Sequence, residues 1–330
     1  MPISTREVRH EIPRAAAIAA LIGAAAVVAA GCSSAESTPT AAAEGDGWSY
    51  TTGYGNTIDL DAAPQKIVVD AYSAAALWDY GIRPAGIFGY GITGGQATGN
   101  ADVSTMKVVG TDGEMNMEAL ADLDPDLVIG YGNSDDPTSW TWWDEPMAQK
   151  VNSVAPFAAV KFSGVQLPDV LAEYRNLAAA LGGDVDGDAA KSDRAAFDAT
   201  SDRIRKVAAE RPDISLLPLN GDNSSLYAGT TKLAQLGYLS GLGVNFVGPD
   251  GDKGWADLSW EQVPSYPADI VMRYVQSHEA FAASPIFVRL PAVAAGQVID
   301  WDDKRPNTYG NYAAWFAELA TVMENAREVA

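Results

Sequence analysis

Short apolar strands alternate with helical stretches along most of the chain, and this order constrains the fold more than any other feature. In the first half, runs typical of strands cover residues 66–70, 84–88, 106–110, 127–129 and 155–162. The helical segments between them include 73–80, the stretch before Pro125, and 142–151. Strands separated by short helices predict βαβ units, in which the strands form a mainly parallel sheet.

A mainly helical segment follows the first half, and the alternation of strands and helices resumes after residue 212. Expected strands cover 214–219, 244–247, 270–274 and 297–301, and expected helices cover 231–241, 259–263 and 311–329. Between the two halves, residues 168–181 and 188–210 both read as helices, and the second has few large apolar residues, which suits packing along one face. We therefore predict two three-layer α/β lobes with mainly parallel sheets, at 48–167 and 212–330, joined by a long connecting helix within 168–211.

The amino terminus has the composition of an export signal. Arg6, Arg9 and Arg14 precede an uninterrupted apolar run from Ala15 to Ala30, which is short for a membrane span and ends in small residues. Residues 32–47 are rich in Ser, Thr, Ala and Gly, as in a flexible tether. We expect residues 1–31 to be removed as a signal peptide.

The charge of the remaining chain limits its partners. Without residues 1–31, 19 basic and 41 acidic residues remain, a net charge of −22. This charge disfavours nucleic acid or an anionic membrane surface as a direct partner. Cys32 is the only cysteine, so an intramolecular disulfide is impossible.

Two motifs match binding signatures only in part. "GYGITGG" at 89–95 contains G-x-G-x-x-G after a strand, but "GQATGNADVS" follows where a dinucleotide site needs a helix. "DVDGDAAKSDRA" at 184–195 has calcium-loop spacing, but Ala189 and Ala195 replace the required glycine and glutamate. We interpret them as a flexible loop and as a solvated turn before a helix.

Histidine is too scarce for several kinds of site. After residue 31 the chain holds only His278, so a typical zinc site and a Ser-His-Asp or Cys-His hydrolase are disfavoured. We predict no resident metal, no cofactor and no enzymatic activity, although residue types leave a carboxylate-only enzyme open.

Aromatic residues recur where predicted strands end. In parallel α/β sheets, ligands bind outside the carboxyl ends of the strands. We therefore expect ligand contacts from one basic and eight aromatic side chains: Tyr72, Tyr90, Tyr131, Trp142, Trp143, Tyr227, Arg273, Trp301 and Tyr309.

The order of these segments resembles a known family, the lipoprotein substrate-binding proteins of iron–siderophore, haem and cobalamin ABC importers. The matching pieces extend from residue 66 to the C-terminus: "PQKIVVDAYSAAALWDYGIRPAGIFGY", "MNMEALADLDPDLVIGYG", "APFAAV", the helical connector, "LSWEQVPSYPADIVM" and "LPAVAAGQVIDWD". The resemblance implies two lobes joined by a rigid helix, with ligand capture between them and little hinge motion.

The resemblance also assigns three residues outside the cleft. In the family, one glutamate on each lobe docks onto arginines of the membrane permease, and Glu118 and Glu261 occupy those positions here. "AAGC" resembles a lipobox with alanine where leucine is usual, which implies that Cys32 is lipidated. We thus expect an exported monomer, anchored by Cys32 to the outer face of the cell membrane, with an ABC permease as partner.

The expected ligand is an iron(III)–siderophore of the hydroxamate type. Arg273 is the clearest basic residue among the candidates, and trianionic catecholates would call for several Arg or Lys side chains. Haem is disfavoured by the missing axial histidine, although a tyrosine could serve, and cobalamin stays open. A ligand-binding surface lipoprotein that works without a permease is the remaining alternative.

Overall fold

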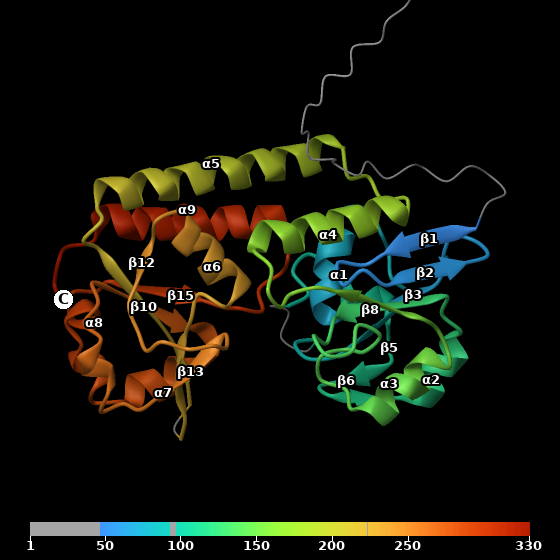
Figure 1. Cartoon of the computed structure of the whole chain (residues 1–330), viewed down its shortest axis with the longest axis horizontal. Helices are drawn as coiled ribbons and strands as arrows, with labels where there is room; N and C mark the ends of the chain where they lie inside the picture. Colours follow the sequence, from blue (N-terminus) through green and yellow to red (C-terminus); the bar gives the residue numbers. More distant parts are fainter. Residues whose placement is uncertain (1–46, 93–96, 223) are drawn as a thin grey trace, which may run out of the picture. The chain divides into compact units, whose positions relative to one another are not determined.

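The computed structural model describes residues 47–92, 97–222 and 224–330, all within one unit of the chain (Figure 1). The predicted signal peptide, Cys32 and the tether up to residue 46 lie outside the described residues. In the described part, no helix combines the length and the apolar character needed to cross a bilayer.

The first lobe is built on a five-stranded sheet in which every neighbouring pair is parallel. Its order is β5 (Lys107–Val108), β4 (Gly86–Phe88), β3 (Ile67–Asp70), β8 (Leu127–Tyr131) and β9 (Phe157–Val160). The helices of this lobe are α1 (Ala71–Trp78), α2 (Met117–Leu123) and α3 (Glu145–Asn152). The predicted parallel sheet is confirmed.

Strand periodicity places a hydrophobic core on each face of this sheet. Successive side chains of a strand point to opposite faces, so Ile67 and Val69 pack with α1 on one side. Val68 points the other way and packs with Leu120 of α2 and Val151 of α3. The lobe is thus a three-layer α/β unit, as predicted.

The second lobe has a mixed sheet. Its order is β13 (Trp255–Leu258), β11 (Leu226–Gly229), β10 (Ser215–Gly221), β14 (Ile270–Tyr274) and β15 (Val298–Trp301), and β12 (Asn245–Phe246) also pairs with β10. β10, β12, β14 and β15 are parallel, whereas β11 runs antiparallel to both of its neighbours, β10 and β13. Helices α6 (Ala234–Gly241), α7 (His278–Ala283) and α8 (Pro291–Ala294) complete the lobe.

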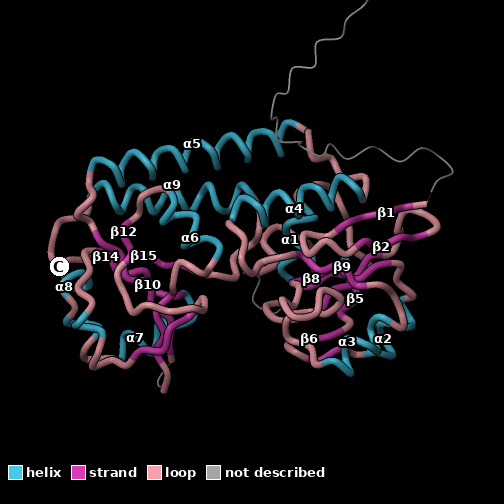
Figure 2. The backbone as a smooth tube through the Cα atoms, viewed as in Figure 1, coloured by secondary structure: helices cyan, strands magenta, loops and turns pink. Residues whose placement is uncertain are grey.

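The middle of the chain forms α4 (Leu167–Ala180) and α5 (Asp188–Glu210), and α5 matches the predicted bounds. α5 lies along α9 (Tyr309–Asn325), as Figure 2 shows. Arg203 of α5 binds both carboxylate oxygens of Glu324 at 2.8 and 2.6 Å. Arg211 donates to the carbonyl oxygens of Glu324 and Ala326 at the end of α9. These bonds tie α5 to the second lobe.

Helix α4 contributes to the cores of both lobes. Leu167 and Leu171 are buried in the core that contains α5, α6 and α9. Val170, Tyr174 and Leu177 are buried in the core under the first sheet. The longer helix α5 also reaches both cores, since Ala190 lies in the core of the first lobe and Phe197 in the core of the second. The connection between the lobes therefore includes the predicted long helix α5 together with α4.

Three element predictions need correction. The short helix expected to start within 259–263 is only a 3₁₀ turn at Val263–Ser265, preceded by a turn at 260–262, since Pro264 has no N–H for an α-helical bond. α3 begins at Glu145, not at Trp142, because Asp144 caps it by accepting from the Met147 N–H. The closing helix covers Tyr309–Asn325 instead of 311–329.

Short antiparallel pairs were not predicted from the sequence. β1 (Trp48–Thr51) pairs with β2 (Thr57–Leu60), and β6 (Gly110–Thr111) pairs with β7 (Glu114–Met115). The Trp48 indole donates to the Ala180 carbonyl at 2.8 Å, which fixes the first pair against the end of α4.

Candidate functional site

Asp70 organises the carboxyl end of the first sheet. It ends β3 and caps α1 by accepting from the Ser73 N–H at 2.8 Å. Its other oxygen accepts from the Tyr131 N–H at 2.8 Å and from the Trp140 indole at 2.9 Å. Burial raises the pKa of this carboxyl, and the hydrogen bonds that it accepts oppose the shift. One fully buried side chain thus fixes α1, the end of β8 and Trp140 together.

An aromatic wall forms around this carboxylate. We define it by six residues that a continuous series of ring contacts links: Tyr72, Tyr90, Tyr131, Trp140, Trp142 and Phe162. Tyr131 stacks on Phe162 with 3.3 Å between ring centroids, and Trp140 meets Trp142 at 4.6 Å. Gly89 permits this packing because it adopts φ +95° and a Cβ there would lie 2.9 Å from the Trp140 ring.

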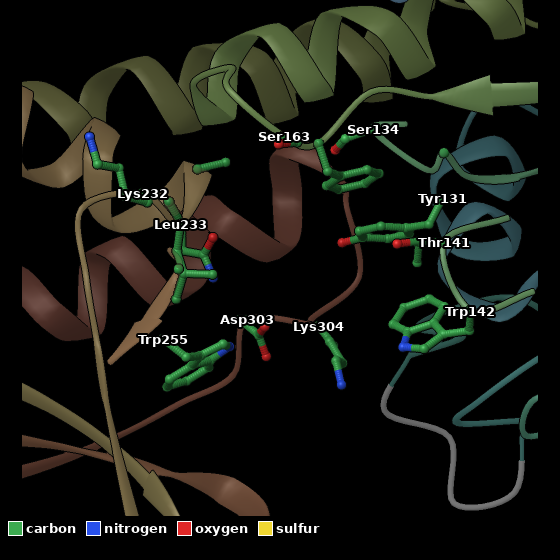
Figure 3. Close-up of a pocket in the computed structure, with 15 residues that line it drawn as sticks. Tyr131, Ser134, Thr141, Trp142, Ser163, Lys232, Leu233, Trp255, Asp303 and Lys304 are labelled. Carbon is green, nitrogen blue, oxygen red and sulfur yellow. The ribbon is translucent and has the colours of Figure 1, made fainter. Parts of the chain in front are cut away.

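The aromatic wall borders a cavity of about 320 Å³, here called the main cavity (Figure 3). Tyr131 and Trp142 come from the first lobe, and Trp255 and Leu233 lie across from them. Asp303 and Lys304 lie between the two sides. The remaining lining residues are Gly132, Ser134, Thr141, Phe162, Ser163, Lys232, Ala234, Gln235 and Gly254.

The charges that line the main cavity nearly balance. Lys232 and Lys304 bring positive charge and Asp303 negative charge. The Tyr274 hydroxyl donates to Asp303 at 2.8 Å, and burial raises the pKa of this carboxyl while Lys304 opposes the shift. The Lys304 ammonium lies 5.7 Å from the Trp142 ring centroid, within the range of a cation–π contact. Such a site suits a ligand with broad apolar faces and little net charge.

Four of the nine predicted ligand contacts lie in the aromatic wall. Tyr131 and Trp142 also line the main cavity. Tyr72 is buried behind them and contacts both rings, whereas Tyr90 is 37% exposed beside Trp142.

The other five lie elsewhere in the described structure. Trp143 and Trp301 are buried in the cores of the first and second lobe. Tyr227 lies within the antiparallel strand β11, and Tyr309 packs edge-on against Phe197 of α5. Arg273 donates twice to Asp300, at 3.0 and 2.8 Å, which neutralises the predicted basic group.

Sequence reasoning missed several lining residues. Phe162 and Asp303 each follow a parallel strand by two residues, so the rule applied to the tyrosines would also have selected them. Trp255 begins the antiparallel strand β13 at the sheet edge, a place that this rule does not reach.

The two partial motifs form no ligand site in the described residues. Residues 97–100 after the glycine-rich segment form turns instead of a helix. Asp186 pairs with Arg175 and Arg194 before α5, as expected for a solvated turn. Across the described ranges, no cluster of three or more His, Cys, Asp or Glu side chains is placed to hold a metal ion.

Both predicted docking glutamates are exposed. Glu118 lies in the first turn of α2. Glu261 lies in the turn before Val263, where hydrogen bonds from its own backbone N–H and the Ser259 hydroxyl lower its pKa. Glu261 therefore stays ionised at neutral pH without help from a helix dipole.

Comparisons with known proteins identify a matching family and similar solved structures. The family model described as periplasmic binding protein matches residues 89–305. DesE, a ferric-siderophore receptor protein from Streptomyces coelicolor, is 33% identical, with a TM-score of 0.80 over 86% of this chain and 100% of its own. No curated protein matches the sequence significantly.

More distant structures share the fold alone. The siderophore periplasmic binding protein of the Thermobifida fusca fuscachelin cluster is 24% identical, with a TM-score of 0.62 over 80% of this chain and 97% of its own. The triscatecholate siderophore binding protein FeuA from Bacillus subtilis is 14% identical, with a TM-score of 0.63 over 83% of this chain and 97% of its own.

The cavity is lined from both lobes, and the matching family model is that of periplasmic binding proteins, so the chain is of the substrate-binding class. This chain belongs to the periplasmic binding protein family. Family membership confirms the predicted class and the prediction of a binding protein rather than an enzyme.

Proposed function

We propose that this chain captures an iron(III)–siderophore in the main cavity. The observation that carries the proposal is the aromatic wall, whose rings Tyr131, Trp142 and Phe162 face the cavity opposite Trp255. Flat apolar faces bind the organic backbone of a chelate through dispersion and desolvation. The similarity to DesE over its full length supports the same ligand class.

A hydroxamate-type siderophore fits the charges best. Ferric trihydroxamates carry little net charge, whereas ferric tricatecholates are trianions that would need several cations. In the described lining, two lysines are partly offset by Asp303, and Arg273 is held by Asp300. The volume of about 320 Å³ lies within the usual range for small-molecule sites.

Tryptophan fluorescence tests this proposal directly, because Trp142 and Trp255 line the main cavity. The full chain is titrated with a ferric trihydroxamate, a ferric tricatecholate, haem and cobalamin. We expect saturable quenching and the highest affinity with the trihydroxamate. Tightest binding of haem or cobalamin would contradict the ligand class, and tightest binding of the tricatecholate would contradict the hydroxamate type.

We also propose that the loaded protein delivers its ligand to an ABC permease through Glu118 and Glu261. Exposed like charges on separate lobes can orient a protein on a basic surface, and both side chains are exposed. The double variant Glu118→Gln/Glu261→Gln should keep its affinity for the chelate but lose most iron uptake in cells.

The control for this experiment removes the same charge elsewhere. Glu210 and Glu328 are exposed on other parts of the chain, so Glu210→Gln/Glu328→Gln should leave uptake unchanged. Normal uptake in the docking variant would favour a surface lipoprotein that works without this contact.

Anchoring by Cys32 and action as a monomer complete the proposal. Mass spectrometry of the mature N-terminus should find acyl chains on residue 32, since several chains are needed for stable attachment. An unmodified cysteine would exclude this anchor.

A further inference from the structure

A second, much smaller cavity adjoins the main cavity. The two share Tyr131, Phe162, Ala234, Gln235 and Asp303, so the small cavity lies directly against the larger one, at a side that we call its floor. It has a volume of about 10 Å³, which is room for roughly one oxygen atom or one water molecule. Its other lining residues are Leu167 and Val170 of α4, Asn307, and Tyr312 of α9.

Two buried amides face this small cavity without hydrogen-bond partners. Gln235 and Asn307 are only 4% and 3% exposed, and the Gln235 Nε2 and Asn307 Nδ2 atoms make no hydrogen bond in the described structure. Burial raises the pKa of the Tyr131 phenol, and the nearby Asn307 amide opposes this shift, although the amide nitrogen lies outside normal hydrogen-bond geometry. Buried N–H groups almost always have an acceptor, and two such donors at one cavity are suited to binding an oxygen atom.

We propose that Gln235 and Asn307 form an oxygen-acceptor subsite at the floor of the main cavity, which binds a carbonyl oxygen of the chelate. This proposal rests on the proposed function and extends it from the rings to a polar contact. Hydroxamate and amide groups both present carbonyl oxygens that accept hydrogen bonds from N–H donors. Leu167, Val170 and Phe162 lie around the small cavity, and a hydrogen bond in such a largely apolar surrounding is stronger than one in bulk water.

The position of the two donors makes the subsite selective. Gln235 lies in the first turn of α6, and Asn307 lies in the loop before α9. A chelate seated against Tyr131 and Phe162 therefore reaches the amides only if one carbonyl points to the cavity floor. The rings would hold many chelates, and the amides would select among their orientations.

The test replaces each amide by an apolar side chain of similar size, Gln235→Met and Asn307→Leu, in the full chain. The probe is a ferric trihydroxamate or a ferric tricatecholate, whichever the unmodified protein binds more tightly. We expect the dissociation constant to rise about tenfold or more, because the bound carbonyl loses its donors. The urea midpoint of the ligand-free protein should stay the same or rise, because an unsatisfied buried amide has been removed.

Gln149→Met is the matched control, since Gln149 is exposed on α3. This variant should change neither the dissociation constant nor the urea midpoint. An unchanged dissociation constant in both cavity variants would overturn the subsite. A lower urea midpoint with unchanged affinity would identify a resident water and would also overturn it. If the unmodified protein binds neither chelate, the proposed function itself fails, and the subsite fails with it.

The isosteric variants Gln235→Glu and Asn307→Asp cover the case in which an apolar variant does not fold. Each variant replaces the donating amide nitrogen with an oxygen and places a second carboxyl group at a cavity that Asp303 already lines, so the affinity at pH 7 should fall. Unchanged affinity in a folded isosteric variant, with a native near-ultraviolet dichroism spectrum, would contradict the proposal.

Discussion

The two sheets both direct the carboxyl ends of their strands toward the main cavity, but they equip those ends differently. The first lobe supplies aromatic rings, with Tyr131 at the end of β8 and Phe162 after β9. At the carboxyl ends of β14 and β15, the second lobe supplies carboxylates and their partners, with Asp300 on Arg273 and Asp303 on Tyr274. The same topological position thus provides apolar contact in one lobe and fixed polar groups in the other.

This difference indicates how binding is divided. Rings contribute most of the contact area and tolerate many ligand shapes, whereas polar groups restrict charge and orientation. In the second lobe, the ring at the end of β15 is Trp301, and it packs into the core instead of facing the cavity. Substitutions in the two lobes should therefore separate effects on stability from effects on binding.

The largest expected effect is on stability, from Trp301→Ala. This indole is fully buried and donates to the Leu219 carbonyl at 3.3 Å. Its loss should lower the free energy of unfolding by about 3–5 kcal/mol. Urea denaturation measures the change, with Trp142→Ala as the comparison because Trp142 is 36% exposed. An equal loss of unfolding free energy in both variants would contradict the distinction between rings buried in the core and rings of the aromatic wall.

Asp70→Asn should have the next largest effect, about 3 kcal/mol of unfolding free energy. An amide in this place turns N–H groups toward the Tyr131 and Trp140 donors, which are then left unsatisfied. Asp144→Asn is the control, because Asp144 caps α3 at the surface, where asparagine caps equally well. Similar urea midpoints for the two variants would show that Asp70 does not fix the aromatic wall.

Asp269→Asn tests the amino end of β14, opposite the end that faces the main cavity. We expect the free energy of unfolding to fall by about 2 kcal/mol. Burial opposes ionisation of Asp269, but hydrogen bonds from Val329, Ser215 and Ala330 outweigh it and lower its pKa. Because the pKa is lowered, the stabilisation is present above about pH 4 and is lost as the pH falls through the folded-state pKa. Urea midpoints between pH 2 and 7 should therefore fall less steeply in the variant, and parallel curves would contradict this assignment.

Trp142→Ala should weaken chelate binding about tenfold, equivalent to about 1.4 kcal/mol, with little effect on folding. The ring lines the main cavity and contacts Tyr131 and Tyr90. Tyr227→Phe, outside the described cavity lining, should leave the affinity unchanged. A larger loss with Tyr227→Phe than with Trp142→Ala would reverse the comparison between the lobes.

The smallest effect is expected from Arg273→Met. Its guanidinium is paired with the partly exposed Asp300, and such pairs contribute less than about 1 kcal/mol. We expect the affinity for a ferric trihydroxamate to change by less than about twofold. A tenfold loss by fluorescence titration would mean that Arg273 leaves Asp300 to contact the ligand.

The sequence was most informative where periodicity and end signals agree. α5 and β14 lie at the predicted residues because a continuous pattern ends at a clear signal, such as Pro212 after α5. β11 and β13 were missed because strands of only four residues have no distinctive period. The antiparallel direction of β11 also explains why Tyr227 does not sit at a parallel strand end.

Strand position predicts the edge of the sheet but not which way a ring points. Trp142 and Trp143 are neighbours in one loop, yet Trp142 lines the cavity and Trp143 packs against Phe88 and Phe157. Their difference depends on the path of residues 132–144, which the β-bridge between Gly132 and Trp140 fixes. A tertiary contact of this kind leaves no local pattern in the sequence.

The placement of α4 in both cores has a kinetic consequence. A large movement of one sheet relative to the other would pull Leu171 or Tyr174 out of its core and expose apolar surface. Capture should therefore proceed without a slow closing step. In stopped-flow fluorescence, the observed rate should rise linearly with chelate concentration and follow a single exponential; a rate that saturates would reveal a conformational step that α4 does not prevent.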